Sequence, residues 1–303
     1  TMYGPLGLMA NIARTRLAEY KQGKTGIRPH VQCENTHAMG NSMGNQREFY
    51  DIYENYPAMA GEFVWDWKDQ GLKVNATNAP MKFEALGRKG QADVVSILDI
   101  QKGEYWAYGG DFGDRPSDNN FCCNGVVLAD NSPTAKSFEM KKIYQPLDFV
   151  MKDSANAVFT LKSKLQQRVL DDLNVSYVLL EDGMEIARGD IKDVVLGVGQ
   201  TRDVTLAKAK ALVTAPQHPE AEYHIRFVAT QKEDTEWAKA GFEVASEQIL
   251  LRAATDRKPY EALGGGKLQI AETDNAVTIT GDNFSVAFVD GLLTAYTVNG
   301  KNM

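Results

Sequence analysis

The sequence contains few cysteines and few histidines, and it has no long apolar run. Three cysteines in 303 residues are too few for a disulfide framework, and the adjacent residues Cys122 and Cys123 cannot easily bridge each other. We expect all three to be free, buried thiols. The four histidines lack the HExxH spacing of zinc proteases, which argues against a zinc site. No run of about 18 apolar residues occurs, so we expect no membrane-spanning segment.

A surplus of positive charge is also missing. Lysine and arginine total 33, against 40 aspartates and glutamates, which gives a net charge of -7. This mild acidity argues against nucleic acid or an anionic membrane as the main partner. The G-x-S-x-G signature of a serine nucleophile is absent, and the glycines at 108–114 do not form the GxGxxG pattern of a phosphate-binding loop. No cationic start with an apolar core is present, so no signal peptide is visible.

The first 137 or so residues have the pattern of an α/β domain. Apolar residues recur at helical spacing over 8–17 and again over 49–56. Short apolar runs at 30–33 and 63–65 predict two buried strands, one on either side of the second helix. A strand, a helix and a strand within this length predict a parallel βαβ unit.

The pattern then changes to all-β. Residues alternate between apolar and polar over 158–162 and 223–227. The apolar run 175–180 leads into Asp182-Gly183, a dipeptide typical of two-residue hairpins. Turn signals every ten or so residues predict a β-sandwich, which we expect to be immunoglobulin-like and to span 138–256.

A third segment begins after a linker, which Pro259 and three consecutive glycines predict over 257–266. Strands are predicted beyond it at 276–280, 284–288 and 293–298. A three-stranded meander makes a poor closed domain because its edges stay open. We therefore expect residues 257–303 to be the start of a larger β-sandwich domain that is cut short. The expected fold class is multidomain α/β plus all-β.

One carboxylate and one histidine stand out in the first segment. The apolar run 30–33 ends beside Glu34, and His37 follows three residues later in a loop of small and polar residues. Burying a charge is expensive unless it is paired or used, so a carboxylate at the end of an apolar strand is a candidate for catalysis. About thirty residues later, the second strand ends near Trp65 and Trp67. A carboxylate and tryptophan faces at neighbouring strand ends are what a sugar-cleaving site needs.

Each of these residues also has a purely structural alternative. Glu34 can be a buried, ion-paired glutamate, and His37 can be a hydrogen-bonded structural histidine. The tryptophans can be core residues, given the area that such side chains bury. Glu62 and Asp66 flank Trp65, and either could serve as a second carboxylate, although a salt bridge in a loop or an interface is the simpler expectation.

Four motifs in the first segment occur together and in order, and they carry a family resemblance. They are CExxHAMGNS at 33–42, FVWDWxDQ at 63–70, YGGDFGD at 108–114 and FCxNG at 121–125. Together they strongly resemble the large bacterial β-galactosidases of glycoside hydrolase family 2. A weaker similarity continues through the predicted sandwich, notably in EWAxAG at 236–241, and into the last strands.

The resemblance implies a fold for each segment. Residues 1–137 match the C-terminal part of a (β/α)8 TIM barrel, the catalytic domain of the family. Residues 138–256 match the immunoglobulin-like β-sandwich that follows the barrel, and 257–303 match the first strands of the C-terminal β-sandwich domain.

The resemblance also implies roles for individual residues. Glu34 matches the nucleophile that forms a covalent galactosyl-enzyme, and Tyr3 matches a tyrosine that hydrogen-bonds this nucleophile. His37 matches the histidine that binds sugar hydroxyls and steadies the transition state. Trp65 matches the aromatic platform under the galactose.

Two metal ions follow from the same resemblance. The backbone carbonyl of Phe121 and the side chain of Asn124 match two ligands of a sodium ion that also meets the sugar. The magnesium ligands and the general acid/base glutamate of the family are expected upstream of Thr1, and no residue of this chain matches them. No organic cofactor is implied.

The function that the resemblance implies is the retaining hydrolysis of terminal β-D-galactosides such as lactose, by a longer protein. We expect the 303-residue chain alone to be inactive, because it carries one catalytic carboxylate of two. The alternatives are a β-glucuronidase or β-mannosidase of the same family, or a non-catalytic carbohydrate-binding scaffold. The expected partner is a small-molecule β-galactoside, with neither nucleic acid nor a membrane, and the longer protein is expected to be a homo-oligomer. The bacterial cytoplasm and periplasm both stay open as compartments.

Overall fold

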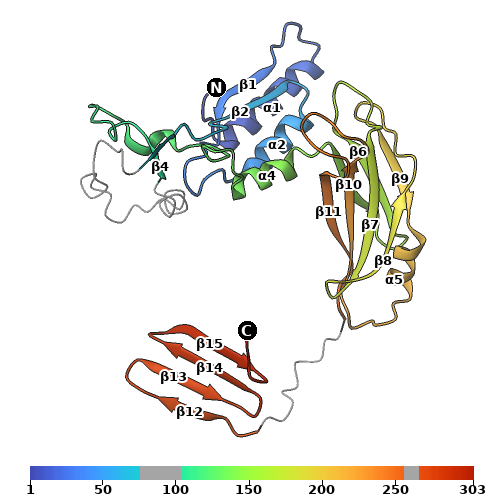
Figure 1. Cartoon of the computed structure of the whole chain (residues 1–303). Coiled ribbons are helices and arrows are strands. Elements are labelled where there is room, and N and C mark those ends of the chain that lie inside the picture. The colour runs from blue at the N-terminus through green and yellow to red at the C-terminus, as the bar shows by residue number, and fades with distance from the viewer. Residues whose placement is uncertain (76–103, 256–265) are drawn as a thin grey trace. The chain divides into compact units, whose positions relative to one another are not determined.

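The computed structural model describes three stretches of the chain, residues 1–75, 104–255 and 266–303. Its contacts divide the chain into two compact units, one of residues 1–216 and 223–252 and one of residues 217–222 and 253–303. The first unit contains a helical part and a β-sandwich, and the second contains one β-sheet (Figure 1). The linker predicted after the sandwich lies almost wholly outside the described residues. The predicted domain limits at 137 and 256 stay predictions.

The helical part of the first unit contains a parallel pair of strands. Its elements are α1 (Leu6–Lys21), β1 (His30–Asn35), α2 (Gln46–Asn55), β2 (Met59–Val64), β3 (Leu72–Asn75), β4 (Glu104–Ala107), the 3-10 helix η3 (Asn119–Cys122) and α4 (Ala135–Ile143). β1 and β2 pair in parallel, from His30 beside Met59 to Asn35 beside Val64, with α2 between them in the chain. The predicted βαβ unit is confirmed. β3 and β4 form a separate antiparallel pair, and the described residues contain no closed barrel.

Helices cover only one face of the β1–β2 sheet. The residues buried between this face and the helices are Met9, Ala13, Phe49 and Met59. Side chains on the other face are open, since Val31 is 40% exposed and Phe63 is 66% exposed. The prediction of two fully buried strands is therefore wrong at alternate positions. None of the three cysteines forms a disulfide, as predicted, but the expectation that they are buried is wrong, because Cys33 is exposed and Cys122 and Cys123 are partly exposed.

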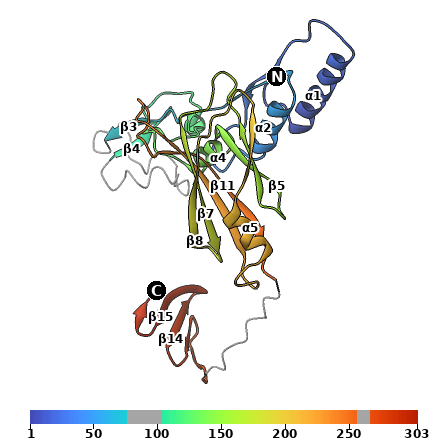
Figure 2. The same ribbon diagram turned by 90° about the vertical axis from the view of Figure 1, so that its right-hand side faces the viewer.

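The β-sandwich consists of two antiparallel sheets, ordered β11-β10-β7-β8 and β5-β6-β9 (Figures 1 and 2). Its elements are β5 (Leu147–Asp153), β6 (Val158–Ser163), β7 (Leu173–Glu181), β8 (Met184–Ile191), β9 (Thr201–Thr205), α5 (Ala207–Thr214), β10 (Tyr223–Gln231) and β11 (Glu243–Arg252). Phe227 of β10 packs between the sheets, with its ring centroid 4.8 Å from that of Phe149 and 5.0 Å from that of Phe159. These rings form the centre of the core, because inward-facing apolar residues alternate along the strands of both sheets.

The hairpin between β7 and β8 follows directly from its sequence. Asp182 has a φ of 45° and Gly183 a φ of 84°. Two successive residues with positive φ make a turn whose twist matches that of the flanking strands. The hairpin predicted at this dipeptide is therefore confirmed.

The second unit is an antiparallel meander with two chemically different faces. Its strands are β12 (Gln269–Glu272), β13 (Ala276–Thr280), β14 (Phe284–Val289), β15 (Leu292–Val298) and β16 (Lys301–Asn302). The register aligns Ile270, Ile279, Val286 and Tyr296 across one face, and Ala271, Thr278, Ala287 and Ala295 across the other. None of the residues in these strands is buried. The three predicted strands are confirmed, and their place at the start of a larger sandwich stays a prediction.

The helices in the described part of the chain include none that is long and apolar enough to cross a membrane.

A buried lysine joins the helical part of the first unit to its sandwich. The Lys164 side chain is 3% exposed, and its Nζ lies 3.2 Å from a carboxylate oxygen of Glu54 in α2 and 3.8 Å from one of Asp148 in β5. The same ammonium donates to the backbone carbonyl of Ile143 at 2.8 Å and lies 4.6 Å from the ring centroid of Tyr50. One cation therefore contacts α2, the end of α4 and the first strand of the sandwich.

We expect Lys164→Met to lower the free energy of unfolding by roughly 3–5 kcal/mol, because Glu54 and Asp148 would keep their burial and lose the cation that compensates it. Urea denaturation followed by tryptophan fluorescence measures the change. Lys162→Met, at a partly exposed position of β6, is the control and should shift stability by less than about 0.5 kcal/mol. Equal losses in the two variants would contradict this account.

Candidate active site

The site is built where β1 and β2 end side by side. Glu34 is the penultimate residue of β1, and Trp65 directly follows β2. The ends of parallel strands meet at one edge of a sheet, which is where α/β barrels place their catalytic side chains. Two backbone hydrogen bonds extend the contact beyond the strands, from Trp65 N to Asn35 O at 3.0 Å and from Ala38 N to Trp65 O at 2.6 Å.

Tyr3 holds the Glu34 backbone and contacts its side chain. The Tyr3 N–H donates to the carbonyl of Glu34 at 2.8 Å, and Met2 bridges Glu34 in the manner of a parallel strand. The Tyr3 hydroxyl also hydrogen-bonds the Glu34 carboxylate. Burial, that hydrogen bond and the nearby negative charges of Glu34 and Asp66 raise the pKa of Tyr3 to about 12. Tyr3 is therefore a protonated donor at neutral pH.

His37 lies between two aromatic rings at the same edge. Its ring centroid is 6.1 Å from that of Tyr3 and 5.3 Å from that of Phe121. The His37 Nε2 atom is buried and has no hydrogen-bond partner among the described residues. A buried ring nitrogen without a partner is costly unless a ligand supplies one.

The aromatic residues of the site are open to solvent. Trp65 is 40% exposed, Phe121 is 56% exposed and Trp67 is 60% exposed. The alternative that the two tryptophans are core residues is therefore wrong for the described structure. Glu34 is only partly buried, and none of the ion pairs between described residues includes it, so the buried ion-paired glutamate is not observed either.

Asn124 ties the FCxNG segment to the residues that follow Trp65. Its backbone carbonyl accepts the N–H of Asp66 at 2.8 Å, and its side-chain Oδ1 accepts the Nε2–H of Gln70 at 3.1 Å. Gly125 follows in a crowded position, where an added Cβ would lie 2.2 Å from the backbone nitrogen of Asp69. Only glycine fits that position, so the segment keeps Asn124, which is 3% exposed, beside Asp66.

Sodium and magnesium, the two expected metal ions, need different ligands. The carbonyl of Phe121 and the amide oxygen of Asn124 are hard oxygen ligands, which suit sodium. They lie three residues apart in one short segment. No group of three or more His, Cys, Asp or Glu side chains in the described part of the chain is placed to hold a metal ion.

Glu62 lies in a partly buried network of neutral partners. Its carboxylate accepts hydrogen bonds from the side-chain amides of Asn35 and Gln46 and from the hydroxyl of Tyr144, and Tyr53 lies beside it. Burial raises the pKa of Glu62, while these hydrogen bonds act in the opposite direction. The expectation of a salt bridge at Glu62 is wrong, because amides and phenols take the place of a cation. The network touches Asn35, the neighbour of Glu34, and so supports the end of β1.

Asp66, the other carboxylate beside Trp65, is hydrogen-bonded by residues close to it in the sequence. It accepts the N–H of Trp67 and the Nε2–H of Gln70, the latter at 2.7 Å. These partners are uncharged, so the salt-bridge expectation is wrong at this position too.

Lys136 of α4 reaches the loop that carries His37. Its Nζ donates to the backbone carbonyl of Ala38 and lies 3.5 Å from that of Gly40. Burial lowers the pKa of Lys136, and the charge of Asp69 opposes this shift. The lysine therefore fixes the loop against α4.

Comparisons with known proteins identify the family to which this chain belongs. Residues 1–149 match the TIM barrel domain of glycosyl hydrolases family 2, and residues 159–252 match domain 4 of β-galactosidase. The chain belongs to glycosyl hydrolases family 2. The part of this family 2 chain with the parallel strands thus corresponds to a TIM barrel domain, and a β-sandwich domain follows it.

Individual relatives agree with this assignment. A β-galactosidase of Priestia megaterium is 31% identical over 261 residues, which cover 86% of this family 2 chain and 22% of the relative. A β-galactosidase of Halalkalibacterium halodurans is 32% identical over 289 residues, which cover 91% of this chain and 24% of the relative. The chain thus spans about a quarter of the length of these curated relatives. Among solved structures, the exo-chitosanase of Amycolatopsis orientalis matches at 14% identity over 54% of this chain and 20% of that chain, with a TM-score of only 0.27.

The structure adds site residues that the motifs of this family 2 chain did not reveal. Lys136 and the partners of Glu62 contact the site from α2 and α4, through side chains distant in the sequence. The expected residues Glu34, Tyr3, His37 and Phe121 lie close together, and Trp65 and Asn124 join them through backbone hydrogen bonds at the same edge.

Glu62 generates a pH prediction. Its folded-state pKa is raised, so the folded protein holds this proton more tightly than the unfolded chain does. The resulting stabilisation is present below the ordinary glutamate pKa of 4.5 and is lost as the pH rises through the folded pKa. Glu62→Gln removes this term, so the unfolding free energy of wild type minus that of the variant should fall as the pH rises above about 4.5. Urea titrations across this range test it, and a constant difference would contradict it.

Lys136 generates a second prediction. Lys136→Met should speed hydrogen exchange of the backbone amides in the loop 36–44 by roughly 10- to 100-fold, because the loop loses a charged donor worth roughly 1.5–3 kcal/mol. Exchange measured by mass spectrometry resolves this loop. Lys141→Met on the same helix is the control and should leave the loop unchanged. Unchanged exchange in Lys136→Met would show that the lysine does not hold the loop.

Proposed function

We propose that this chain supplies the nucleophile of a retaining glycoside hydrolase that cleaves terminal β-D-galactosides such as lactose. One observation carries the proposal: Glu34, hydrogen-bonded by Tyr3, lies at the edge where His37 and Trp65 are also held. A carboxylate with a bound donor can serve as the nucleophile of a retaining site, and an unpartnered imidazole nitrogen and an exposed indole can contact the hydroxyls and the C–H face of a sugar.

The proposed chemistry assigns one step to each residue. Glu34 attacks the anomeric carbon as the bond to the leaving oxygen breaks, and a covalent galactosyl-enzyme forms. Tyr3 orients the attacking carboxylate through its hydroxyl. Trp65 presents its ring to the apolar C–H face of galactose, and Nε2 of His37 meets a sugar hydroxyl. Water then releases galactose with retention of configuration.

The general acid that protonates the leaving oxygen is not among these residues. Glu62 is unsuited to the role, because its carboxylate is enclosed by Asn35, Gln46, Tyr53 and Tyr144. We therefore propose that the acid/base glutamate and the magnesium ligands belong to other parts of a longer protein, and that the 303-residue chain alone is inactive. A homo-oligomer is proposed for that longer protein.

Phe121 and Asn124 are proposed to hold sodium. When bound, the ion would supply a fixed positive charge that orients a sugar hydroxyl. Asn124 is held in place without the ion, because its backbone carbonyl accepts the N–H of Asp66 and its side chain accepts that of Gln70.

Trapping tests the nucleophile in the longer protein that carries this chain. Reaction with dinitrophenyl 2-deoxy-2-fluoro-β-galactoside should add one sugar to the peptide that contains Glu34, as seen by mass spectrometry. Glu34→Gln should abolish the adduct and lower kcat by roughly 10⁴-fold or more. Tyr3→Phe should keep the adduct and slow its formation by about 10- to 100-fold, the value of one hydrogen bond to a charged group.

The rival functions give different results in the same experiment. A non-catalytic scaffold would form no adduct at Glu34. A β-glucuronidase or β-mannosidase would react faster with the corresponding fluorinated glucuronide or mannoside than with the galactoside. Turnover of a nitrophenyl galactoside by the 303-residue chain alone, abolished by Glu34→Gln, would overturn the proposal that a second carboxylate comes from elsewhere.

A further inference from the structure

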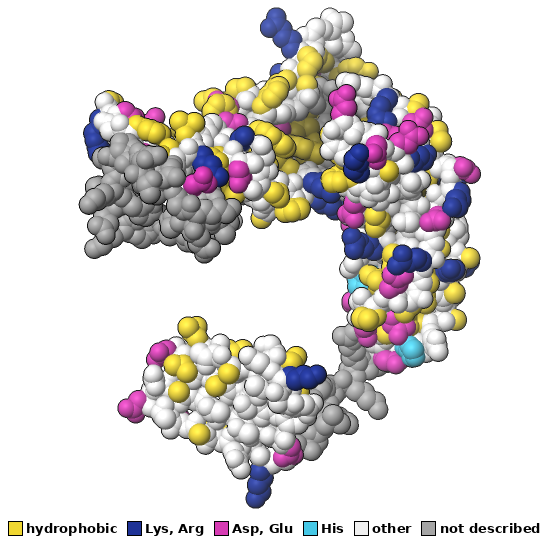
Figure 3. Space-filling model, viewed as in Figure 1, with side chains coloured by type: hydrophobic (Ala, Val, Ile, Leu, Met, Phe, Trp, Pro, Cys, Tyr) yellow, Lys and Arg dark blue, Asp and Glu magenta, His cyan; other side chains and the backbone are white. Residues whose placement is uncertain are grey.

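A second cavity lies away from the Glu34 site, between α4 and the β10–β11 side of the sandwich. Its volume is ≈ 450 Å³, within the range of small-molecule sites in proteins. Figure 3 shows hydrophobic side chains gathered in the hollow between the helical part and the sandwich. Trp67 and Tyr144 line both this cavity and the surroundings of the candidate active site, but Glu34, His37 and Trp65 do not line the cavity.

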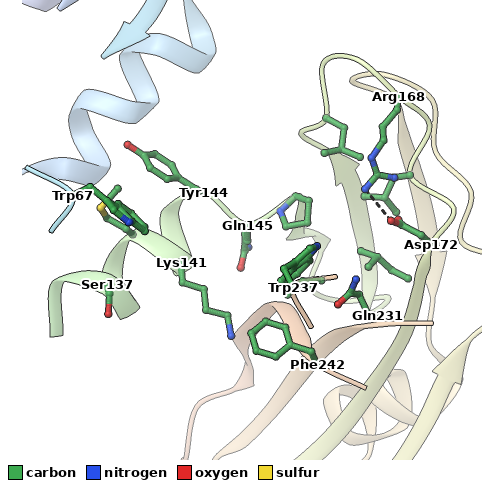
Figure 4. Close-up of a pocket in the computed structure, with 16 residues that line it drawn as sticks. Trp67, Ser137, Lys141, Tyr144, Gln145, Arg168, Asp172, Gln231, Trp237 and Phe242 are labelled. Carbon is green, nitrogen blue, oxygen red and sulfur yellow. Dashed lines mark hydrogen bonds and ion pairs between the residues drawn. The ribbon is translucent and has the colours of Figure 1, made fainter. Parts of the chain in front are cut away.

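Two tryptophans face the cavity from opposite sides. Trp67 enters from the helical part and Trp237 from the loop between β10 and β11 (Figure 4). Trp67 is 60% exposed and Trp237 is 66% exposed. Phe242 supports Trp237 edge-on, with ring centroids 5.5 Å apart and planes at 82°. Lys141 lies over the Phe242 ring at 4.6 Å. Indole faces that stay this exposed, and are held by a neighbouring ring, are suited to stacking a flat apolar surface.

Two buried acceptor oxygens of residues that line the cavity receive no hydrogen bond from the described residues. Gln231 is only 5% exposed, and its Nε2 donates to Thr235 at 3.1 Å, while its Oε1 is buried with no partner among the described residues. Asp172 pairs one carboxylate oxygen with Arg168 at 2.8 Å and leaves the other buried and unpartnered. A buried acceptor without a donor costs free energy, so two of them at one cavity need an explanation.

The ligand must therefore bring donors and an apolar face together. A hydrocarbon would leave both acceptors unsatisfied, and an anion would be repelled by the unpaired oxygen of Asp172. The nearby cations are already engaged, Arg168 by Asp172 and Lys141 by Phe242. A neutral pyranose carries hydroxyl donors around its rim and C–H groups on its face. We propose that this cavity is a second carbohydrate-binding site, stacking a neutral saccharide between Trp67 and Trp237 and donating hydroxyls to Gln231 and Asp172.

Binding experiments on the 303-residue chain test the proposal. The background variant is Trp65→Ala, so that sugar at the candidate active site does not contribute and failure of the proposed function leaves this test intact. Lactose, β-1,4-galactotriose and cellobiose are the probes, measured by saturation-transfer NMR and calorimetry. At least one probe should bind with a Kd below about 10 mM. Trp67→Ala and Trp237→Ala should each weaken binding by about tenfold or more.

Two further variants keep the outcome unambiguous. Phe138→Ala removes an aromatic ring of α4 that is 63% exposed and does not line the cavity, and it should leave binding unchanged. Gln231→Met keeps the side-chain length, removes the acceptor and should also weaken binding, with an unchanged melting temperature in the Trp237→Ala variant as the check on folding. No probe binding below about 10 mM would overturn the proposal. Concentration-dependent self-association that Trp237→Ala abolishes, without sugar binding, would overturn it too, because the tryptophans would then serve a protein contact.

Discussion

The parallel pairing of β1 with β2 is the constraint on which the candidate site depends. It brings Asn35 beside Val64, so the residues around these strand ends share one edge of the sheet. A register irregularity between Gln32 and Asn35 leaves both Cys33 and Glu34 more exposed than these two buried neighbours, and a slip of one residue would exchange exposed and buried positions along the strand. The hydrogen bond from Asn35 to Glu62 crosses the same two strands and opposes such a slip. The register of β1 with β2 thus also determines which side chains lie at the candidate site.

Two glutamates on neighbouring strands, Glu34 and Glu62, have different surroundings. Glu34 lies at the rim with one phenol as its partner, accessible to a ligand. Glu62 lies inside, enclosed by two amides and two phenols, and its raised pKa reflects burial. Environment separates carboxylates into those that react and those that hold structure. In this chain the inner carboxylate supports the strand end that presents the outer one, which explains why a polar network occupies a position where apolar packing is the simpler choice.

The sequence predicts short-range features better than long-range ones. Periodicity found β1, α2 and the β7–β8 hairpin, because the signal for each lies within a few residues. The motifs found Glu34, His37 and Trp65 for the same reason. α4 was missed, since its capping box uses Ser137 in place of the usual glutamate. The contacts of Lys136 with Ala38 and of Tyr144 with Gln46 each span 98 residues, and no local pattern announces a pairing over that distance.

The first residues of the chain run along β1 and reach the site. The Thr1 ammonium donates to the carbonyl of Val31 at 3.2 Å, the Thr1 carbonyl accepts the N–H of Cys33, and Tyr3 then meets Glu34. These contacts hold the residues that precede α1 against β1, so a shift of this segment would move the Tyr3 ring relative to the Glu34 carboxylate.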